Sequence, residues 1–227
     1  MKVALILYIF VASTVRRIGG NIVDIKEVSY IALISASNDQ REKLVCGGSI
    51  ITKQFILTSG YCAVACDEDH MSEVYIGTVN ADAGGTKIGI GHYIYHETWK
   101  KYKNKPGGVM TISQSEFSNN VVDLGLLRTK DQIQLSDTIQ PIRLPIDYFS
   151  HGTVIVTGVG IKKVLEIGEA VAYIEKSRVN HISIKSNRVL HCVDYGFPMI
   201  SGEYVVGVSS FHTKETTRGA MWMSIHI

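Results

Sequence analysis

Short apolar runs, interrupted every few positions by polar or turn-forming residues, dominate the hydrophobic pattern of this chain. No long stretch repeats with a helical or heptad period, so the pattern favours strands over helices. The runs predict β-strands at Tyr30–Ser35, Glu73–Gly77 and Ile88–Tyr95. Two more β-rich runs flank a turn at residues 52–54. We therefore expect a β-rich protein.

The first residues depart from that pattern and are typical of a targeting signal. Lys2 gives a positive start, residues 3–12 are apolar, and Val11-Ala12-Ser13 offers small residues for cleavage. Such a run is too short to cross a bilayer, and no later run approaches the roughly 18 apolar residues of a membrane helix. We therefore expect residues 1–13 to be a signal peptide and the protein to be secreted, without a membrane partner.

Composition describes an ordinary globular protein. The chain has 227 residues, of which 45% are hydrophobic and 19% charged, which suits one domain or a two-barrel unit. Without Lys2, Arg16 and Arg17, 20 of the 23 basic residues remain against 21 acidic ones, a net charge of about −1. The charge therefore gives no argument for a nucleic-acid partner. The sequence also contains no Asn-x-Ser/Thr acceptor for N-glycosylation.

Three segments carry the candidate chemistry. Residues 46–62 begin Cys-Gly-Gly-Ser-Ile-Ile and end Leu-Thr-Ser-Gly-Tyr-Cys, residues 119–127 read Asn-Asn-Val-Val-Asp-Leu-Gly-Leu-Leu, and residues 192–198 read Cys-Val-Asp-Tyr-Gly-Phe-Pro. In the same order they resemble the histidine, aspartate and serine segments of the trypsin/chymotrypsin-like serine proteases. The resemblance places Tyr61 at the catalytic histidine, Asp123 at the triad aspartate and Tyr195 at the nucleophilic serine.

The resemblance implies an all-β fold of two antiparallel six-stranded Greek-key β-barrels with a cleft between them. Residues 139–145 resemble the linker between the barrels, and Gly152–Gly160 resembles a strand of the second barrel. The sequence leaves no room for most of the family's C-terminal helix. A disulfide between Cys46 and Cys62 is also implied. Cys66 and Cys192 have no partner by resemblance, so mutual pairing, pairing with another chain and free thiols all stay open.

Residues 14–17 resemble a very short activation peptide, because Arg16-Arg17 precedes Ile18-Gly-Gly. This places the trypsin-like (peptidase S1-type) domain at residues 18–227. In active relatives the freed isoleucine ammonium pairs with the carboxylate before the nucleophile, which here means Ile18 and Asp194. Such a pair, withdrawn from water, orders the loop around it. The family has Ile-Val-Gly-Gly, one residue longer, so a dibasic remnant without activation is the alternative.

Acyl transfer on this architecture needs a nucleophile, a base, an orienting carboxylate and an oxyanion hole. A tyrosine has an ordinary pKa near 10, so Tyr61 is no base near neutral pH. One residue is missing between Cys192 and Asp194, which removes an oxyanion donor. The resemblance puts the substrate pocket at Leu190, His191, Ser210, Phe211 and His212, without the acidic floor of a trypsin. We expect no peptidase activity.

By resemblance, the long segment between His96 and Asp123 overhangs the cleft. It carries four lysines: Lys100, Lys101, Lys103 and Lys105. A partner-binding or cleft-blocking loop and a solvated run of charge are equally open interpretations. His92 and His96 would lie about 13 Å apart along a strand, too far to share a metal. We expect no metal and no other cofactor.

Loss of both base and nucleophile most resembles the inactivated serine protease paralogues of parasitic mites. That resemblance implies a secreted pseudo-protease, expected to be a monomer, that binds host proteins of complement or a protease cascade and dampens host defence (immune evasion). The alternative is an active trypsin-like serine endopeptidase with displaced catalytic residues, such as Ser209, Ser210 or His191. A duplicate without a selected role is a third interpretation.

Overall fold

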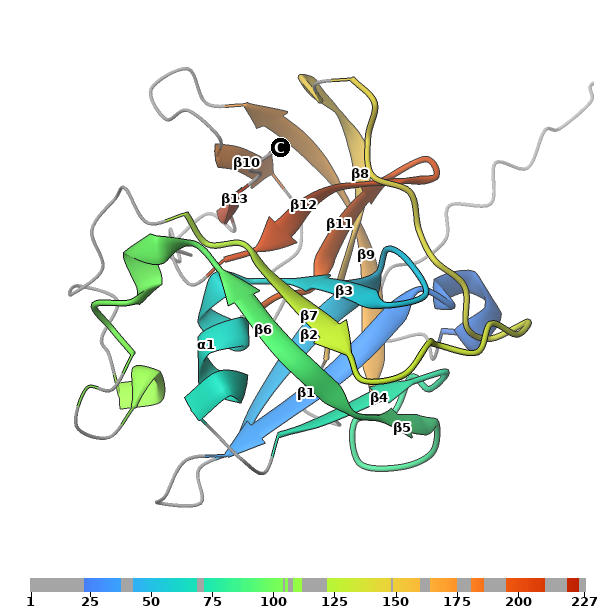
Figure 1. The fold of residues 1–227 in the computed structure, drawn as a ribbon. Helices are drawn as coiled ribbons and strands as arrows, with labels where there is room; N and C mark the ends of the chain where they lie inside the picture. The colour runs from blue at the N-terminus through green and yellow to red at the C-terminus, as the bar shows by residue number, and fades with distance from the viewer. Residues whose placement is uncertain are drawn as a thin grey trace, which may run out of the picture.

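The computed structural model describes residues 23–37, 43–68, 72–103, 105, 108–111, 122–147, 149–159, 164–174, 181–185, 195–210 and 220–224. Each half of the chain forms an antiparallel sheet that curls on itself. Figure 1 shows the N-terminal half, blue to green, packed beside the C-terminal half, orange to red. The prediction of an all-β protein with two barrels is confirmed.

The N-terminal sheet has seven strands in the order β5-β4-β1-β2-β3-β7-β6. Its edges, β5 and β6, are consecutive in sequence and separated only by Gly89, so one bent segment brings the edges together. The expected six strands become seven because the ladder breaks at this bend. The strands are β1 (Ile31–Ser37), β2 (Lys43–Ile50), β3 (Phe55–Thr58), β4 (Glu73–Ile76), β5 (Thr86–Ile88), β6 (Ile90–Tyr95) and β7 (Gly125–Thr129).

The C-terminal sheet is a closed barrel of six strands in the order β10-β13-β12-β11-β8-β9. Closure pairs every strand edge, which protects the backbone from pairing with another chain. The strands are β8 (His151–Val159), β9 (Leu165–Ile174), β10 (His181–Lys185), β11 (Pro198–Ser201), β12 (Tyr204–Ser209) and β13 (Ala220–Ser224).

Both barrels follow the same path once β5 and β6 are counted as one bent strand. In each barrel the first three strands are successive neighbours, and the sixth strand lies beside the third. The fifth strand then lies between the sixth and the fourth, and the fourth strand also pairs with the first. This repeated order is the expected Greek-key arrangement.

A short helix, α1 (Gly60–Glu68), follows β3 and was not predicted. The hydroxyl of Ser59 accepts the backbone N–H of Cys62 at 3.1 Å, which caps the first turn. Residues 60–66 are all buried, so the helix carries no polar stripe that would reveal its period. The disulfide between Cys46 on β2 and Cys62 ties this helix to the sheet, as the resemblance implied.

The two barrels are joined by the linker and by shared packing. The N–H of Ile142 donates to the carbonyl of Ile50 at 2.9 Å, while the carbonyl of Arg143 accepts the N–H of Val205 at 2.9 Å. Adjacent linker residues are therefore bonded to opposite barrels. Phe197, which is fully buried, packs in one cluster with Ile31 of β1 and other residues of both halves. The remaining short helices are η1 (Ile25–Val28), η2 (Glu97–Trp99) and η3 (Val109–Thr111).

Candidate functional site

Tyr61, Asp123 and Ser210 come from three different elements and meet at one buried carboxyl group. Tyr61 lies in the first turn of α1, Asp123 just before β7, and Ser210 just after β12. The backbone N–H of Tyr61 donates to Oδ1 of Asp123 at 2.9 Å. The hydroxyl of Ser210 donates to Oδ2 at 2.5 Å. Ser210, expected as a pocket residue, thus binds the retained aspartate.

The rings of Tyr61 and Tyr195 are in contact. Their centroids are 4.9 Å apart and their planes meet at 65°, an edge-to-face arrangement that stabilises aromatic pairs. Tyr61 also packs against Trp99 at 6.2 Å between centroids, and only 3% of its surface is exposed. Burial, followed by the nearby Tyr195 and Asp123, raises the pKa of Tyr61 well above its ordinary value. Its hydroxyl therefore stays protonated at neutral pH.

The loop after Tyr195 is fixed by backbone hydrogen bonds. The carbonyl of Tyr195 accepts the N–H of Gly47 at 2.8 Å, and the N–H of Gly196 donates to the carbonyl of Ser209 at 2.8 Å. The N–H of Phe197 donates to the Ser209 hydroxyl at 2.9 Å. Both N–H groups that follow Tyr195 are thus directed at β12 rather than at the cleft.

Gly196 has a φ of +81°, and a side chain there would place Cβ 2.3 Å from the Thr58 hydroxyl. Only glycine satisfies both the backbone angle and the close approach. The same loop brings the Phe197 ring onto Gly47, where an added Cβ would lie 2.3 Å from the ring. Phe197 occupies the position of the family's second glycine, and the missing Cβ of Gly47 leaves room for its ring.

Several expected site residues lie outside the described part of the chain. These are the proposed activation pair Ile18 and Asp194, the pocket positions Leu190, His191, Phe211 and His212, and Cys192. The described residues bring together Tyr61, Asp123, Tyr195 and Ser210. Cys66 is buried in α1.

The lysine segment is exposed only in part. Lys100 and Lys101 are exposed. Lys103 instead forms an ion pair with Asp67, which lies at the end of α1, and its Nζ is 2.5 Å from Oδ2 of Asp67. Asp67 also accepts the Tyr95 hydroxyl at 2.7 Å. Lys101 and Lys105 lie over the ring of Tyr102, at 4.7 and 5.5 Å from its centroid. A fully solvated run of charge is therefore the wrong description.

Sequence reasoning missed the side chains that hold this segment. Trp99 is fully buried, and its indole N–H donates to the carbonyl of Val122 at 2.9 Å. Tyr102, 4% exposed, packs against Trp99, and Glu68 accepts the N–H of Val109 at 2.7 Å. Trp99 and Tyr102 lie about one helical turn apart, and this spacing was the available indication that both rings face the same side. The lysines between them made the segment resemble a solvent-exposed run instead.

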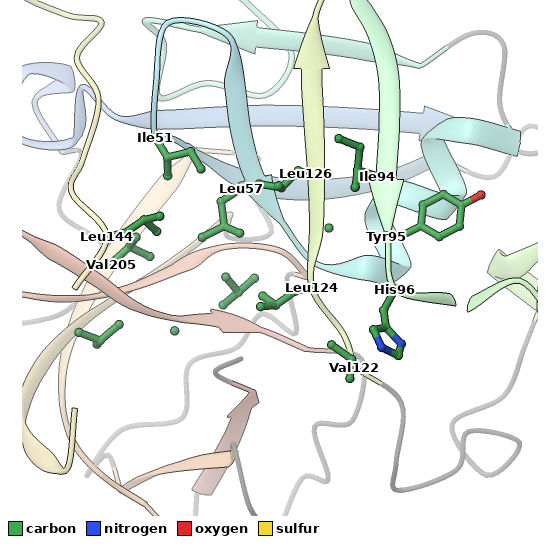
Figure 2. A pocket seen from close by; sticks show the side chains of 14 residues that line it. Ile51, Leu57, Ile94, Tyr95, His96, Val122, Leu124, Leu126, Leu144 and Val205 are labelled. Carbon is green, nitrogen blue, oxygen red and sulfur yellow. The ribbon is translucent and has the colours of Figure 1, made fainter. Parts of the chain in front are cut away.

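An apolar groove of about 590 Å³ lies between the barrels. Its walls come from β3, β6 and β7 on one side and from β12 and Leu144 on the other. Figure 2 shows Leu144 and Val205 at one end and Tyr95 and His96 at the other. Val122 and Leu124 line this groove, whereas Asp123 between them is bound to Tyr61 and Ser210. One stretch of backbone thus separates the groove from the tyrosine pair.

Two further features are absent from the described ranges of the chain. No group of three His, Cys, Asp or Glu side chains there is placed to hold a metal ion. No helix among those residues is both long and apolar enough to cross a membrane.

Comparison with known proteins agrees with this architecture. The chain has two barrels in Greek-key order, and Tyr61 and Tyr195 face each other beside Asp123. These features define the class of protein as one with the two-barrel serine-protease fold. The family model described as Trypsin matches residues 17–225. The chain therefore belongs to the trypsin family.

Individual relatives are more distant. The chain is 29% identical over 143 residues to "Serine protease 7" of Drosophila melanogaster, which covers 56% of this chain and 33% of that protein. It is 30% identical over 114 residues to "Complement factor B" of Bos taurus, covering 50% of this chain and 13% of that protein. The chain thus spans about a third or less of these relatives.

Among solved structures, the fold is similar to the scabies mite inactivated protease paralogue S-I1. The TM-score is 0.71 at 17% identity, over 91% of this chain and 93% of that one. At this identity the likeness is one of fold.

Proposed function

We propose that this chain is a secreted, catalytically inactive member of the trypsin family that acts by binding another protein. The contact that carries the proposal is the 4.9 Å edge-to-face packing of Tyr61 on Tyr195. These residues stand at the motif positions of the base and the nucleophile. Their rings occupy the space where an imidazole and a serine hydroxyl would exchange a proton.

The chemistry of the neighbouring groups supports the same proposal. A buried tyrosine whose pKa is raised is a poor proton acceptor, because its hydroxyl keeps its proton at neutral pH. Both oxygens of Asp123 already accept hydrogen bonds, from the Tyr61 N–H and the Ser210 hydroxyl. The aspartate therefore acts as an internal brace between α1 and β12 in this proposal.

Displaced catalytic serines are the competing function. The Ser210 hydroxyl donates to Asp123, and the Ser209 hydroxyl accepts the N–H of Phe197. Ser209 and Ser210 are 3% and 1% exposed, so a substrate carbonyl has no access to either oxygen. These contacts favour the inactive homologue over an endopeptidase with relocated residues.

The proposed partner is a protein of a proteolytic defence cascade, complement included. Support comes from the similarity to a relative named complement factor B and from the fold shared with an inactivated mite paralogue. The exposed Lys100 and Lys101 form the proposed contact surface, since η2 and the contacts of Trp99 and Tyr102 hold their backbone in place. An ordered charged surface loses less entropy on binding than a mobile one.

Catalysis is tested with the protein matured at Ile18, using a broad peptide library and a fluorophosphonate probe of serine hydrolases. We expect neither turnover nor labelling. The variant Tyr61→His/Tyr195→Ser should stay nearly inactive, because the loop before Asp194 is one residue short. Labelling that disappears in Ser209→Ala or Ser210→Ala would establish the displaced-residue enzyme instead.

Binding is tested separately by biolayer interferometry against purified complement and cascade proteins. We expect micromolar or tighter binding by the wild-type protein and loss of at least tenfold in affinity for Lys100→Glu/Lys101→Glu. Lys26→Glu/Lys53→Glu changes two exposed lysines elsewhere and is the matched control. Equal binding by all three proteins would remove the lysine segment from the proposal, and no binding to any panel member would contradict the proposed partner class.

A further inference from the structure

Three strands of the N-terminal barrel form one wall of the groove between the barrels. In the register of the sheet, Leu57 of β3 and Ile94 of β6 both lie opposite Leu126 of β7. All three side chains line the groove, and Figure 2 shows them side by side. Their neighbours Ile56 and Leu127 are buried in the core, on the opposite face of the same strands. The groove wall is therefore an apolar row that crosses three strands on the outer face of the barrel.

The next row on this outer face has a positive charge at its centre. Arg128 lies two residues beyond Leu126 on β7, opposite Phe55 of β3 and His92 of β6. Residues two apart in a strand share a face and are roughly 7 Å apart. Arg128 and His92 are both exposed. Because an arginine stem is long, its guanidinium is within reach of a group at the rim of the groove.

The charge of Arg128 is not neutralised by the described part of the chain, since none of the ion pairs between described residues involves it. Arg143, beside Leu144 on the other side of the groove, is instead paired with Glu203 at 3.0 Å. None of the described residues that line the groove carries a carboxylate. A negatively charged group at this edge of the groove would therefore meet one cation and no competing anion from the groove wall.

We propose that the groove binds a free fatty acid, with its hydrocarbon chain along the apolar row and its carboxylate at Arg128. The hydrocarbon chain is stabilised by every methylene group that leaves water. The groove volume of about 590 Å³ lies within the roughly 300–1,000 Å³ of small-molecule sites. Charge-assisted hydrogen bonds from the guanidinium fix the polar end. The imidazole of His92, opposite Arg128, is a second hydrogen-bonding group at this end.

The shape of the site favours a single dissolved hydrocarbon chain over a bilayer. Proteins that bind a membrane surface insert a protruding apolar face among the acyl chains. The apolar row of this protein lies instead in a groove, walled on its other side by Val205 and Leu144. A bilayer cannot enter such a concave site. The charge at its edge also selects the polar end, because an alcohol forms no ion pair with Arg128 and an amine is repelled by it.

Titration calorimetry on the full-length protein tests the polar end of this site. The ligands are dodecanoate, dodecanol and dodecylamine, each below the concentration at which it forms micelles. We expect one dodecanoate to bind per chain, about tenfold or more tighter than dodecanol, with dodecylamine the weakest. Arg128→Glu should weaken dodecanoate binding at least tenfold and leave dodecanol binding unchanged. Lys26→Glu is the matched control, at an exposed lysine that does not line the groove. Equal affinities for acid and alcohol, or an unchanged affinity in Arg128→Glu, would overturn the proposal.

Methyl NMR tests the position of the hydrocarbon chain independently. Dodecanoate should shift the methyl signals of Leu57, Leu126 and Leu144, and signals that stay in place would contradict the proposed site. Leu144→Asp should weaken binding of both dodecanoate and dodecanol at least tenfold, and its 50% exposed position lets the fold tolerate the change. Ile146→Asp is the control, since Ile146 is 86% exposed and does not line the groove.

Other occupants of the groove give different results. Binding to anionic phospholipid vesicles without binding of dodecanoate would show a membrane surface as the partner. A dimer in sedimentation velocity that Leu144→Asp dissociates, again without dodecanoate binding, would show a second copy of the chain. Nuclear Overhauser contacts within one chain that fill the groove and exclude dodecanoate would show that the protein covers it itself. Each of these three results would overturn the proposal.

Discussion

The hydroxyl of Ser210 donates to Oδ2 of Asp123 at 2.5 Å, across 87 positions of sequence. The backbone N–H of Tyr61 donates to Oδ1 of the same carboxyl group. One buried side chain thereby joins the first turn of α1 to the end of β12. This arrangement makes Asp123 a link between the two barrels.

Removal of that link should lower stability. We expect Ser210→Ala to reduce the free energy of unfolding by about 1–3 kcal/mol, the range for a buried hydrogen bond to a carboxyl group. The double variant with Asp123→Asn should cost less than the sum of the two singles, because both act on one contact. Urea unfolding measures these values, and the exposed Ser150→Ala is the control. Additive costs would contradict the coupling.

Stability should also fall at alkaline pH. Burial raises the pKa of Tyr30 from 10.0 to about 12 and raises that of Tyr61 as well. A raised pKa means that the folded state holds its proton more tightly than the unfolded state. This contribution is complete below pH 10 and is lost as the pH rises towards 12.

The urea midpoint, measured from pH 8 upward, tests this expectation. The wild-type midpoint should be constant at first and should decline above about pH 10. Tyr30→Phe, which cannot ionise there, should decline less steeply. An identical slope in both proteins would rule out Tyr30 as a source of the effect.

The lysine segment should resist proteolysis as long as α1 holds it. We expect Asp67→Asn to speed limited tryptic cleavage after Lys100, Lys101 and Lys103 by a few-fold, because the ion pair with Lys103 is lost. The cost in global stability should be only about 0.5–1 kcal/mol, since both side chains are partly exposed.

Added salt should mimic part of this effect in the wild-type protein by screening the pair. Asp131→Asn, a change of the same kind at an exposed position, is the control. Wild-type cleavage as fast as that of Asp67→Asn would mean that the ion pair does not hold the segment.

The contact between Gly47 and Phe197 should appear as a coupling between two substitutions. Gly47→Ala places a Cβ 2.3 Å from the Phe197 ring and should cost about 1–3 kcal/mol through overpacking. Phe197→Gly alone should cost about 3–5 kcal/mol, because it empties a buried site. In the double variant the clash is gone, so its cost should fall below the sum by about 1 kcal/mol or more. Chemical denaturation measures the cycle, and Gly91→Ala is the control because its Cβ makes only ordinary contacts. If the stability costs of the two single variants simply add in the double variant, the contact between Gly47 and Phe197 is contradicted.

Much of the fold could be predicted because local pattern and motif agreed. The strand that the resemblance implied at Gly152–Gly160 is found as β8 at His151–Val159, and the Cys46 and Cys62 segments carry the spacing of the observed disulfide. The helix α1 escaped prediction because both of its faces are buried, which removes the polar positions that give a helix its period. The strand expected at Ile88–Tyr95 covers β6 and only the last residue of β5, because the ladder breaks at Gly89.

The environment of the candidate site was harder to predict than its residues. Tyr61, Asp123 and Tyr195 follow from the motifs, and the structure places them together. Their surroundings depend on non-local contacts, such as Trp99 on Val122, that leave no periodic trace in the sequence. The groove was missed for a related reason: its residues are shared among four strands and the linker, none of which is unusual alone.

The alternation of Val122, Asp123 and Leu124 has a practical consequence for measuring this protein. Trp99 hydrogen-bonds the carbonyl of Val122, whose side chain lines the groove, and the same indole packs on Tyr61. A molecule that displaces Val122 changes the surroundings of this indole directly. With the second tryptophan, Trp222, replaced by phenylalanine, the intrinsic fluorescence of Trp99 therefore reports groove occupancy without any added label.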